Sequence, residues 1–326
     1  MNNDDMEIEK PLLKWVGGKT QILDKVLNNF PKKINSYHEV FLGGGSVLFG
    51  FLAYVNNKNI KIDGKIYAYD LNSTLISFYK NIQNNRLELY NEIVKIVEPY
   101  HKLFKLNKND SDSEESSDNE SDETDIEDSD NEEKMITPES YYYDIRKKFN
   151  KLTEAEKKSV KGSAMFLFLN KTCFRGLYRV GPNGFNVPYG NYKKPEIINK
   201  HHFNRIHKLI KNVEFREGDF KTSIKNIKEN DFTYLDPPYA PESKTSFVKY
   251  NKAGFSIDNN KELFGLCNSF STKKIKFMMS NSNVELVTNS FPEDTFYIDR
   301  ISCKRSINSK KPGSKTTEVL IRNYKN

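Results

Sequence analysis

The chain has 326 residues, 51 of them Lys or Arg and 44 Asp or Glu, for a formal net charge of +7. At roughly 100–200 residues per domain, this length allows two domains. Its longest strongly apolar run, Ala164–Leu169, has six residues, far short of the ~20 that a membrane-spanning helix needs. The stretch Met1–Lys10 is polar and acidic, unlike a signal peptide. We therefore expect an intracellular protein that is not secreted, in the cytoplasm or, for a viral source, in the host cell or virion.

Two sets of residues could in principle bind metal or form cross-links. They are three widely spaced cysteines and three loosely spaced histidines: Cys173, Cys267, Cys303, His201, His202 and His207. The cysteines form no CxxC pair and are odd in number, which favours neither a zinc site nor a disulfide framework. The histidines lack a nearby set of Cys or acidic partners. We expect no metal.

The charge is distributed unevenly. Residues 107–134 hold 14 acidic and 2 basic residues, which leaves 49 basic and 30 acidic residues in the rest of the chain. A body with that much positive charge is typical of proteins that bind a polyanion such as nucleic acid. A general Lys-rich and Asn-rich composition is the alternative explanation.

The acidic segment 109–133 has one aliphatic residue, Ile126, and no aromatic residue. It cannot bury enough apolar surface to offset the entropy of ordering, so we expect a disordered insertion. It is either a solvated linker without a role, a mimic of phosphate charge that competes with DNA, or a target of acidophilic kinases.

Before this insertion, the elements expected in chain order are a strand, a Gly-rich turn, a helix and a second strand that ends at Asp70: Ser36–Phe41, Gly43–Gly45, Ser46–Val55 and Lys65–Tyr69. This order is that of a βαβ unit. Apolar residues at helical spacing then predict a helix over Leu71–Ile93.

After the insertion, we expect a buried helix, a hairpin with a loop, and four short strands. Their ranges are Gly162–Leu169, Gly176–Pro195, Asn212–Phe215, Phe232–Leu235, Ile275–Met279 and Glu318–Ile321. Strands that alternate with helices favour an α/β fold with a largely parallel sheet.

The strongest chemical signal is Asp236-Pro237-Pro238-Tyr239, which directly follows the apolar strand Phe232–Leu235. Ligands of open α/β sheets bind at the carboxyl ends of the strands. The two prolines stiffen the turn and remove two N–H donors. The Asp236 carboxylate and the Pro237 carbonyl can then accept both hydrogens of one amino group, while Tyr239 offers a flat face for an aromatic base. The alternative is a Pro-Pro turn that ends the strand and binds no ligand.

Two further segments favour a bound nucleotide-like cofactor. Glycines in Phe41-Leu42-Gly43-Gly44-Gly45 allow close approach of a ligand to the backbone and to a helix N-terminus, and Asp70 can accept hydrogen bonds from ribose hydroxyls. This arrangement would serve NAD or S-adenosylmethionine, and the turn at Asp236 favours the methyl donor. Near the N-terminus, Lys19 beside Gly17-Gly18 can pair with the donor's carboxylate, and Trp15 can cover an apolar or cationic part of the ligand.

In this order, the motifs resemble the DNA adenine methyltransferase (Dam) family, the alpha class of N(6)-adenine-specific DNA methyltransferases. The resemblance runs through LKWVGGK, FLGGGS, DLN, NKTCFRGLYRV, FNVPYGNYKKP, DPPYAP, SNS and EVLIRNY, and leaves out only the first ten residues and the acidic insertion. The chain departs from the family pattern at Val40, at Arg175 and in a hairpin that is one residue shorter. These departures bear on the recognition sequence more than on the chemistry.

The resemblance implies a role for each matching residue. Three sets of residues follow from it: catalytic Asp236, Pro237, Pro238 and Tyr239; donor-binding Trp15, Lys19, Phe41, Gly43, Gly45, Asp70, Asp219 and Asp236; and DNA-binding Lys14, Arg175, Leu177, Arg179, Pro188, Lys304 and Arg305. The last two belong to a basic loop that could also be merely solvated.

We therefore expect a Rossmann-like, S-adenosylmethionine-dependent methyltransferase sheet formed by residues 1–80 and 213–326. Residues 81–212 would form a mainly helical target-recognition domain that carries a β-hairpin. The expected activity is methylation of adenine in double-stranded DNA, at GATC from the resemblance, with a cognate restriction endonuclease as a further candidate partner. The alternatives are an enzyme that methylates an amine in RNA or protein, and a catalytically silent DNA-binding homologue.

Overall fold

The computed structural model describes residues 8–109, 136–241, 255–304 and 315–325. The expected acidic insertion and Arg305 lie outside the described residues, apart from Asn109 at the end of a helix. The chain forms two compact units, and each is described by itself. The first consists of Met1–Leu12, Gly17–Gln83 and Asn204–Asn326, and the second of Leu13–Val16 and Asn84–Phe203. The expected domain boundaries, 80/81 and 212/213, stay a prediction.

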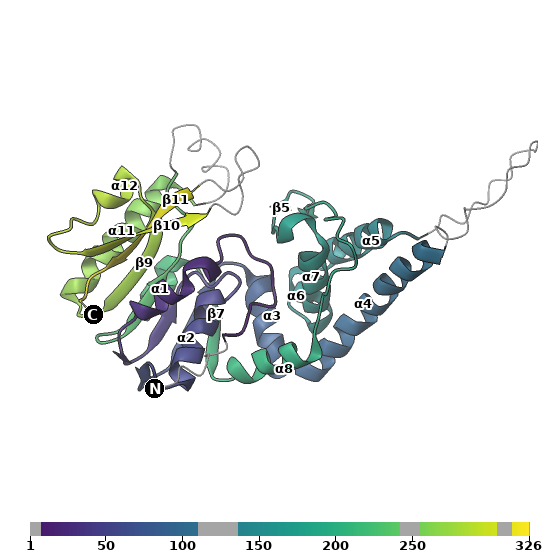
Figure 1. Ribbon diagram of the computed structural model, residues 1–326, viewed down its shortest axis with the longest axis horizontal. Helices are drawn as coiled ribbons and strands as arrows, with labels where there is room; N and C mark the ends of the chain where they lie inside the picture. The colour runs from purple at the N-terminus through teal and green to yellow at the C-terminus, as the bar shows by residue number, and fades with distance from the viewer. Residues whose placement is uncertain (1–7, 110–135, 242–254, 305–314, 326) are drawn as a thin grey trace, which may run out of the picture. The chain divides into compact units, whose positions relative to one another are not determined.

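A seven-stranded sheet is the centre of the first unit (Figure 1). Its strands are β2 (Tyr37–Glu39), β4 (Ile66–Asp70), β7 (Val213–Glu217), β8 (Phe232–Leu235), β9 (Lys276–Ser282), β10 (Tyr297–Lys304) and β11 (Lys315–Arg322). Their order across the sheet is β10-β11-β9-β8-β2-β4-β7. All described pairings from β9 to β7 are parallel, and β11 is antiparallel to both β9 and β10. This largely parallel sheet confirms the expected α/β fold.

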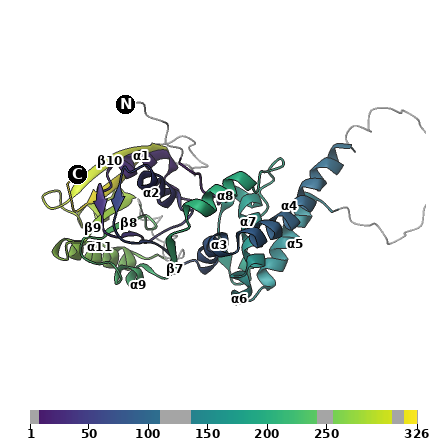
Figure 2. The ribbon, with the colours of Figure 1, turned by 90° about the horizontal axis from the view of Figure 1, so that it is seen from below.

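Helices cover both faces of this sheet, as Figure 2 shows for α1 and α2 on one side and α9 and α11 on the other. The helices and short strands of the unit are η1 (Thr20–Ile22), α1 (Leu23–Asn28), β1 (Lys33–Ile34), α2 (Ser46–Asn56), β3 (Lys61–Ile62), α3 (Ser73–Asn84), α9 (Phe220–Ile224), α11 (Ile257–Thr272) and α12 (Glu285–Thr288). A helix α8 (Lys200–Leu209) crosses the boundary between the units.

Side chains of β8 alternate between two cores. Phe232 and Tyr234 pack in an aromatic cluster around Phe30 on one face. Leu235 points into the other core, which includes Phe264 and Phe270 of α11. Because both faces of the strand are buried, its sequence is a continuous apolar run, as parallel strands usually are.

The helix that we expected over Leu71–Ile93 is two helices, so that expectation was wrong. Asn72 caps α3, since its side chain accepts a hydrogen bond from the Leu75 N–H at 3.1 Å. A second helix, α4, starts at Arg86, and the Asn85 carbonyl before it accepts from the Leu89 N–H at 2.8 Å. Asn is a residue that favours helix ends over helix interiors. Apolar spacing alone did not reveal the break, which also lies where the two units separate.

The second unit is mainly helical and carries a short hairpin. Its elements are α4 (Arg86–Asn109), α5 (Pro138–Lys151), α6 (Glu154–Lys157), α7 (Val160–Thr172), η2 (Phe174–Gly176), β5 (Val180–Gly181) and β6 (Gly184–Phe185). Figure 1 shows α4, α5 and α7 side by side, and α7 packs against both other helices. Residues 162–170 of α7 are all buried, which confirms the expected buried helix.

The strand β2 of the first unit carries a buried acid. Glu39, on β2, is 2% exposed, and its Oε2 accepts a hydrogen bond from the Tyr37 hydroxyl at 2.7 Å. Burial raises the pKa of the Glu39 carboxyl to about 8, and the nearby charge of Asp236 acts in the same direction. Glu39 therefore carries a proton in the native state at neutral pH.

This proton predicts a stability change with pH. From pH 5 to about 7 the native chain keeps a proton on Glu39 that the unfolded chain, with an ordinary pKa of 4.5, has largely released, and this difference fades as pH passes through the native pKa of about 8. Glu39 therefore lowers the free energy of unfolding as pH rises, by up to about 1.4 kcal/mol per pH unit. Glu39→Gln removes this dependence and keeps a hydrogen-bonding group for Tyr37. We expect the stability of the variant relative to wild type to rise from pH 5 to 8 in urea unfolding.

The control for this experiment is Glu293→Gln, which changes a largely exposed acid paired with Arg300. Its stability relative to wild type should vary little with pH. If the free energy of unfolding changes with pH in the same way in Glu39→Gln and in wild type, Glu39 is ionised in the native protein.

Candidate active site

Two loops come together where the chain order in the sheet reverses. From β2 the chain continues to β4 on one side, whereas β8, its parallel neighbour on the other side, is followed by β9 further out. A crevice forms at such a switch point at the carboxyl ends of the two strands, and ligands bind there in open α/β sheets. The Gly-rich loop follows β2, and the turn Asp236–Tyr239 follows β8.

The Gly-rich loop needs its glycines for backbone conformation. Gly43 and Gly45 have φ values of 50° and 77°, which favour residues without a Cβ. Gly45 is the N-cap of α2, and a Cβ there would lie 3.2 Å from the Tyr79 hydroxyl. That hydroxyl donates to the Gly44 carbonyl at 2.7 Å. The loop is thus held from the α3 side and directs helix N–H groups toward the crevice.

Asp70, at the end of β4, also holds this loop. Its carboxylate accepts hydrogen bonds from the backbone N–H of Gly43 at 2.9 Å and of Asn72 at 2.8 Å. Burial raises the pKa of Asp70, while these two bonds act in the opposite direction. The structure therefore places the expected ribose-binding acid next to the Gly-rich loop and gives it a second task in shaping the loop.

Asp236 lies at the centre of the site. Its Oδ2 is 2.7 Å from Lys19 Nζ, and the side chains are 18% and 5% exposed. The other oxygen, Oδ1, is buried and has no hydrogen-bond partner among the described residues. Burial raises the pKa of Asp236, and the ammonium group of Lys19 counteracts this shift. A buried acceptor without a partner is costly, so this oxygen is poised to receive a donor from a ligand.

Lys19 links three parts of the site. Its ammonium group also donates to the Gly17 carbonyl at 2.7 Å and lies 4.9 Å from the centre of the Tyr239 ring. Its backbone N–H donates to Ser46 Oγ, in the first turn of α2, at 3.2 Å. The lysine is therefore buried only because carboxylate, carbonyl and ring surround it.

The rest of the turn is held by side chains of β9 and β11. The Tyr239 hydroxyl donates to Glu318 Oε2 at 2.8 Å. Ala240 N–H donates to Asn281 Oδ1 at 3.0 Å, and its carbonyl accepts from Ser282 Oγ at 2.7 Å. Pro237 is buried and Pro238 is exposed. Glu318 and Ser282 lie in the EVLIRNY and SNS motifs, but sequence reasoning assigned them no role.

The remaining donor-site residues of this unit lie around α9. Asp219 is the N-cap of α9, and its Oδ1 accepts from the Thr222 N–H at 2.8 Å. Hydrogen bonds from Thr222 lower the pKa of Asp219. The Phe41 ring lies 6.2 Å from that of Phe220, in a stacked arrangement. Asp219 follows β7, and β7 is the sheet neighbour of β4, which ends at Asp70.

Trp15, which we expected to bind the donor, and Lys14, which we expected to bind DNA, both belong to the second unit. The backbone N–H and carbonyl of Lys14 bond to the side-chain amide of Asn170, both at 2.8 Å. The Lys14 ammonium group lies 3.8 Å from the centre of the Tyr192 ring, and the Trp15 ring stacks on that of Tyr178 at 5.8 Å. The segment is therefore fixed to the end of α7 and to the loop near the hairpin.

The expected DNA-binding residues gather on and near the hairpin of the second unit. Arg179 is exposed, and its Nε and Nη2 donate to the side chain and carbonyl of Asn186 at 2.6 and 3.1 Å. Arg175 is exposed too and has a φ of 55°. Leu177 is half-buried, and Pro188 is exposed, with its carbonyl bonded to the Phe174 N–H at 2.9 Å. Lys304 ends β10 in the first unit, and Arg305 lies outside the described residues.

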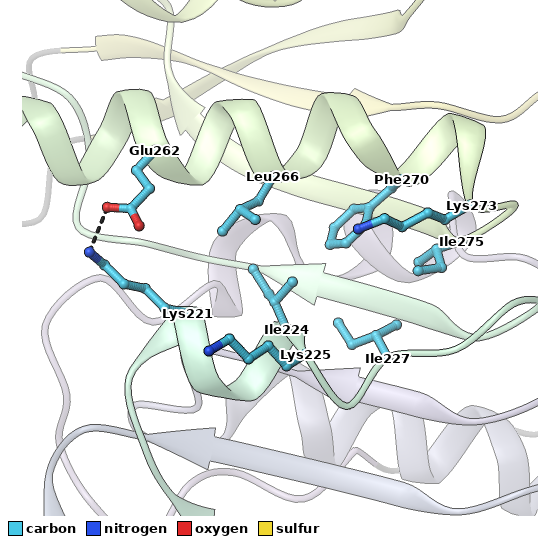
Figure 3. Close-up of a pocket in the computed structure, with 9 residues that line it drawn as sticks. All are labelled: Lys221, Ile224, Lys225, Ile227, Glu262, Leu266, Phe270, Lys273 and Ile275. Atoms are coloured by element: carbon cyan, nitrogen blue, oxygen red, sulfur yellow. Dashed lines mark ion pairs between the residues drawn. The ribbon is translucent and has the colours of Figure 1, made fainter.

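A separate groove of about 300 Å³ lies between α9 and α11, with an apolar floor and three lysines at its rim (Figure 3). Lys221 and Glu262 form an ion pair of 2.6 Å across it. None of the expected site residues lines this groove.

In the described ranges, no group of three or more His, Cys, Asp or Glu residues could hold a metal ion. No helix there is long and apolar enough to cross a membrane.

Comparison with known proteins agrees with this geometry. Residues 15–307 match the model of the D12 class N6 adenine-specific DNA methyltransferases. The chain is 36% identical to the Type II methyltransferase M.MjaIII of Methanocaldococcus jannaschii, over 98% of this chain and 100% of that protein. It is 29% identical to the Type II methyltransferase M1.LlaDCHI of Lactococcus lactis subsp. cremoris, over 97% and 96%. The DNA adenine methylase of Escherichia coli K12 is 27% identical, over 98% and 97%.

A family match over most of the chain and a relative at 36% identity that aligns along its full length leave one conclusion. The chain belongs to the D12 class of N6 adenine-specific DNA methyltransferases, and it is an enzyme that methylates adenine in DNA.

Proposed function

We propose that the protein transfers a methyl group from S-adenosylmethionine to the exocyclic amine of adenine in double-stranded DNA, within the sequence GATC. The observation that carries this proposal is Asp236 Oδ1, a buried acceptor without a partner among the described residues, at the switch point of the sheet. An amino group that enters the crevice can satisfy this oxygen.

The residues around the Gly-rich loop fit the methyl donor. The loop brings backbone and a helix N-terminus close to the crevice, Asp70 stands beside it for ribose hydroxyls, and Lys19 offers a cation for a carboxylate. The donor supplies a methyl group on positively charged sulfur, which is activated without a metal. The task of the chain is to bind and orient.

The turn after β8 is suited to hold an adenine. A stacked base cannot reach it, so the base must first leave the helix, at a cost of a few kcal/mol. Asp236 and the Pro237 carbonyl then accept the two amino hydrogens, and Tyr239 stacks on the ring. These acceptors localise the nitrogen lone pair and stabilise positive charge that develops on nitrogen.

We assign target recognition to the second unit and catalysis to the first. Arg179 supports this assignment, because Asn186 occupies two of its five N–H donors and fixes its plane. The remaining donors suit bidentate recognition of guanine O6 and N7. Leu177, Arg179 and Pro188 match the positions that read bases in the Dam family, which supports GATC. Lys14, Arg175, Lys304 and Arg305 would contact the phosphate backbone.

Asp236→Ala should lower methyl transfer to adenine by at least about 100-fold, the usual scale for loss of one group that stabilises developing charge. Calorimetry should detect weakened binding of the donor. Transfer of tritium from labelled donor is measured on duplex DNA and on RNA of the same sequence. Glu293→Gln, an exposed change, is the control. Near-wild-type turnover of Asp236→Ala would contradict the proposal. A wild-type enzyme that methylates only the RNA would contradict it as well.

Lys19→Met should shift the pH dependence of the rate. Catalysis needs ionised Asp236, so the rate falls as pH falls through the raised pKa of Asp236. Loss of the Lys19 ammonium raises this pKa further. The acid limb of the rate profile, measured at saturating donor, should therefore move to higher pH, whereas the exposed change Lys25→Met leaves it in place. A limb that moves to lower pH in Lys19→Met would be the opposite of this expectation.

Arg179→Ala should relax sequence discrimination by about 1–3 kcal/mol at one base pair, the usual value of a bidentate guanine contact. The readout is the sequence around each modified adenine in plasmid from a host without adenine methylation. Wild type should modify GATC. Lys148→Ala, an exposed change on α5 of the same unit, should leave the pattern as it is. If Arg179→Ala loses rate equally at all sites, the residue does not read a base.

A further inference from the structure

We infer that Glu318 is a positioning residue for methyl transfer, which fixes the ring of Tyr239 for stacking by holding its hydroxyl. This inference rests on the proposed function, in which Tyr239 stacks on the extruded adenine. The observation behind it is the 2.8 Å hydrogen bond from the Tyr239 hydroxyl to Glu318 Oε2.

The position of Glu318 in the sheet makes it a rigid support. It lies on β11, between β9 and β10, and pairs with Ser282 on one side and with Ile301 on the other. Because β11 is paired with β9 on one side and β10 on the other, the backbone at Glu318 has little freedom to move. Sites held by strands are positioned more narrowly than sites held by loops alone.

Glu318 and its register partner Ser282 hold consecutive residues of the catalytic turn. Glu318 holds the side chain of Tyr239, while Ser282 Oγ donates to the carbonyl of Ala240 at 2.7 Å. The antiparallel strand β11 thus presents an acceptor beside the end of β9, and the turn after β8 is bound to both strands. One pair of residues sets the orientation of the ring and the path of the chain beyond it.

The tyrosine needs such a support. Its ring is only partly buried, and a base that stacks on it requires one face to stay open. The Lys19 ammonium lies 4.9 Å from the ring centre, and the hydroxyl is the polar atom through which Glu318, on β11, holds the ring. A ring displaced by about 1 Å can cost roughly 100-fold in rate, so an anchor of this kind affects turnover more than binding of the donor.

Glu318→Leu removes the acceptor and should lower kcat by about 10- to 100-fold, with little change in the KM for the donor. Glu318→Gln keeps an oxygen that can accept from the hydroxyl and should recover most of this loss. Thr317→Ala, at the exposed neighbouring position on β11, is the matched control. Thermal melting and donor calorimetry check that each variant folds.

Tyr239→Phe provides the decisive background, because it removes the hydroxyl and keeps the ring. If Glu318 acts through that hydroxyl, Glu318→Leu should cost less than about threefold when it is added to Tyr239→Phe, since coupled residues are not additive. With 2-aminopurine at the target position, Glu318→Leu should also give brighter fluorescence than wild type, because the extruded base stacks less.

Equal losses from Glu318→Leu in both backgrounds, or a loss that Glu318→Gln does not recover, would overturn the inference while the proposed function stands. A wild-type protein that leaves duplex DNA unmodified would overturn both.

Discussion

The ion pair between Lys19 and Asp236 is the interaction on which the active site depends. Burial raises the pKa of the Asp236 carboxyl, and the Lys19 ammonium group acts against this rise and favours the charged form. Lys19 pairs with Oδ2, and Oδ1 has no hydrogen-bond partner among the described residues. The same ammonium contacts the Gly17 carbonyl and the Tyr239 ring. The site is thus preorganised by one buried cation, and the folding energy of the sheet offsets the cost of an unpaired acceptor.

The sheet topology explains why such a site forms here. β2 and β8 are parallel neighbours from which the chain continues in opposite directions across the sheet, so the loops after them lie at its switch point, where ligands bind in open α/β sheets. One loop is rich in glycine and precedes a helix, and the other is rich in proline. The first brings N–H donors to the crevice, and the second offers mainly acceptors. Under the proposed function, the N–H donors suit the anionic end of the methyl donor, and the acceptors suit the target amine. The two turns therefore offer different groups, because one is rich in glycine and the other in proline.

Local sequence was sufficient for part of this structure. The strand before Gly43, the helix after it, the strand that ends at Asp70 and the turn at Asp236 could all be predicted, because periodicity and turn residues act over a few positions. The break at Asn85 could not, since the apolar pattern continues across it. The strand β10 was missed because its residues, Tyr297–Lys304, mix polar and apolar side chains at the edge of the sheet.

The contacts within the site were beyond the reach of local sequence for a different reason. The pairing of Lys19 with Asp236, and of Glu318 with Tyr239, joins positions far apart in the chain. Motifs pointed to these segments without indicating which atoms meet, because the strand order of the sheet decides which loops become neighbours.

Two buried acids near each other raise the question of how the site avoids mutual repulsion. The charge of Asp236 raises the pKa of Glu39, and of the two acids only Asp236 pairs with Lys19. Glu39 bonds instead to the Tyr37 hydroxyl, which is neutral, and its pKa of about 8 keeps the proton on it. Near neutral pH, Glu39 therefore adds no negative charge beside Asp236. Buried acids that differ in this way can take different roles, because the environment separates their pKa values. Glu39 thus serves as a neutral hydrogen-bonding partner of the Tyr37 hydroxyl and leaves the negative charge that the proposed function requires to Asp236.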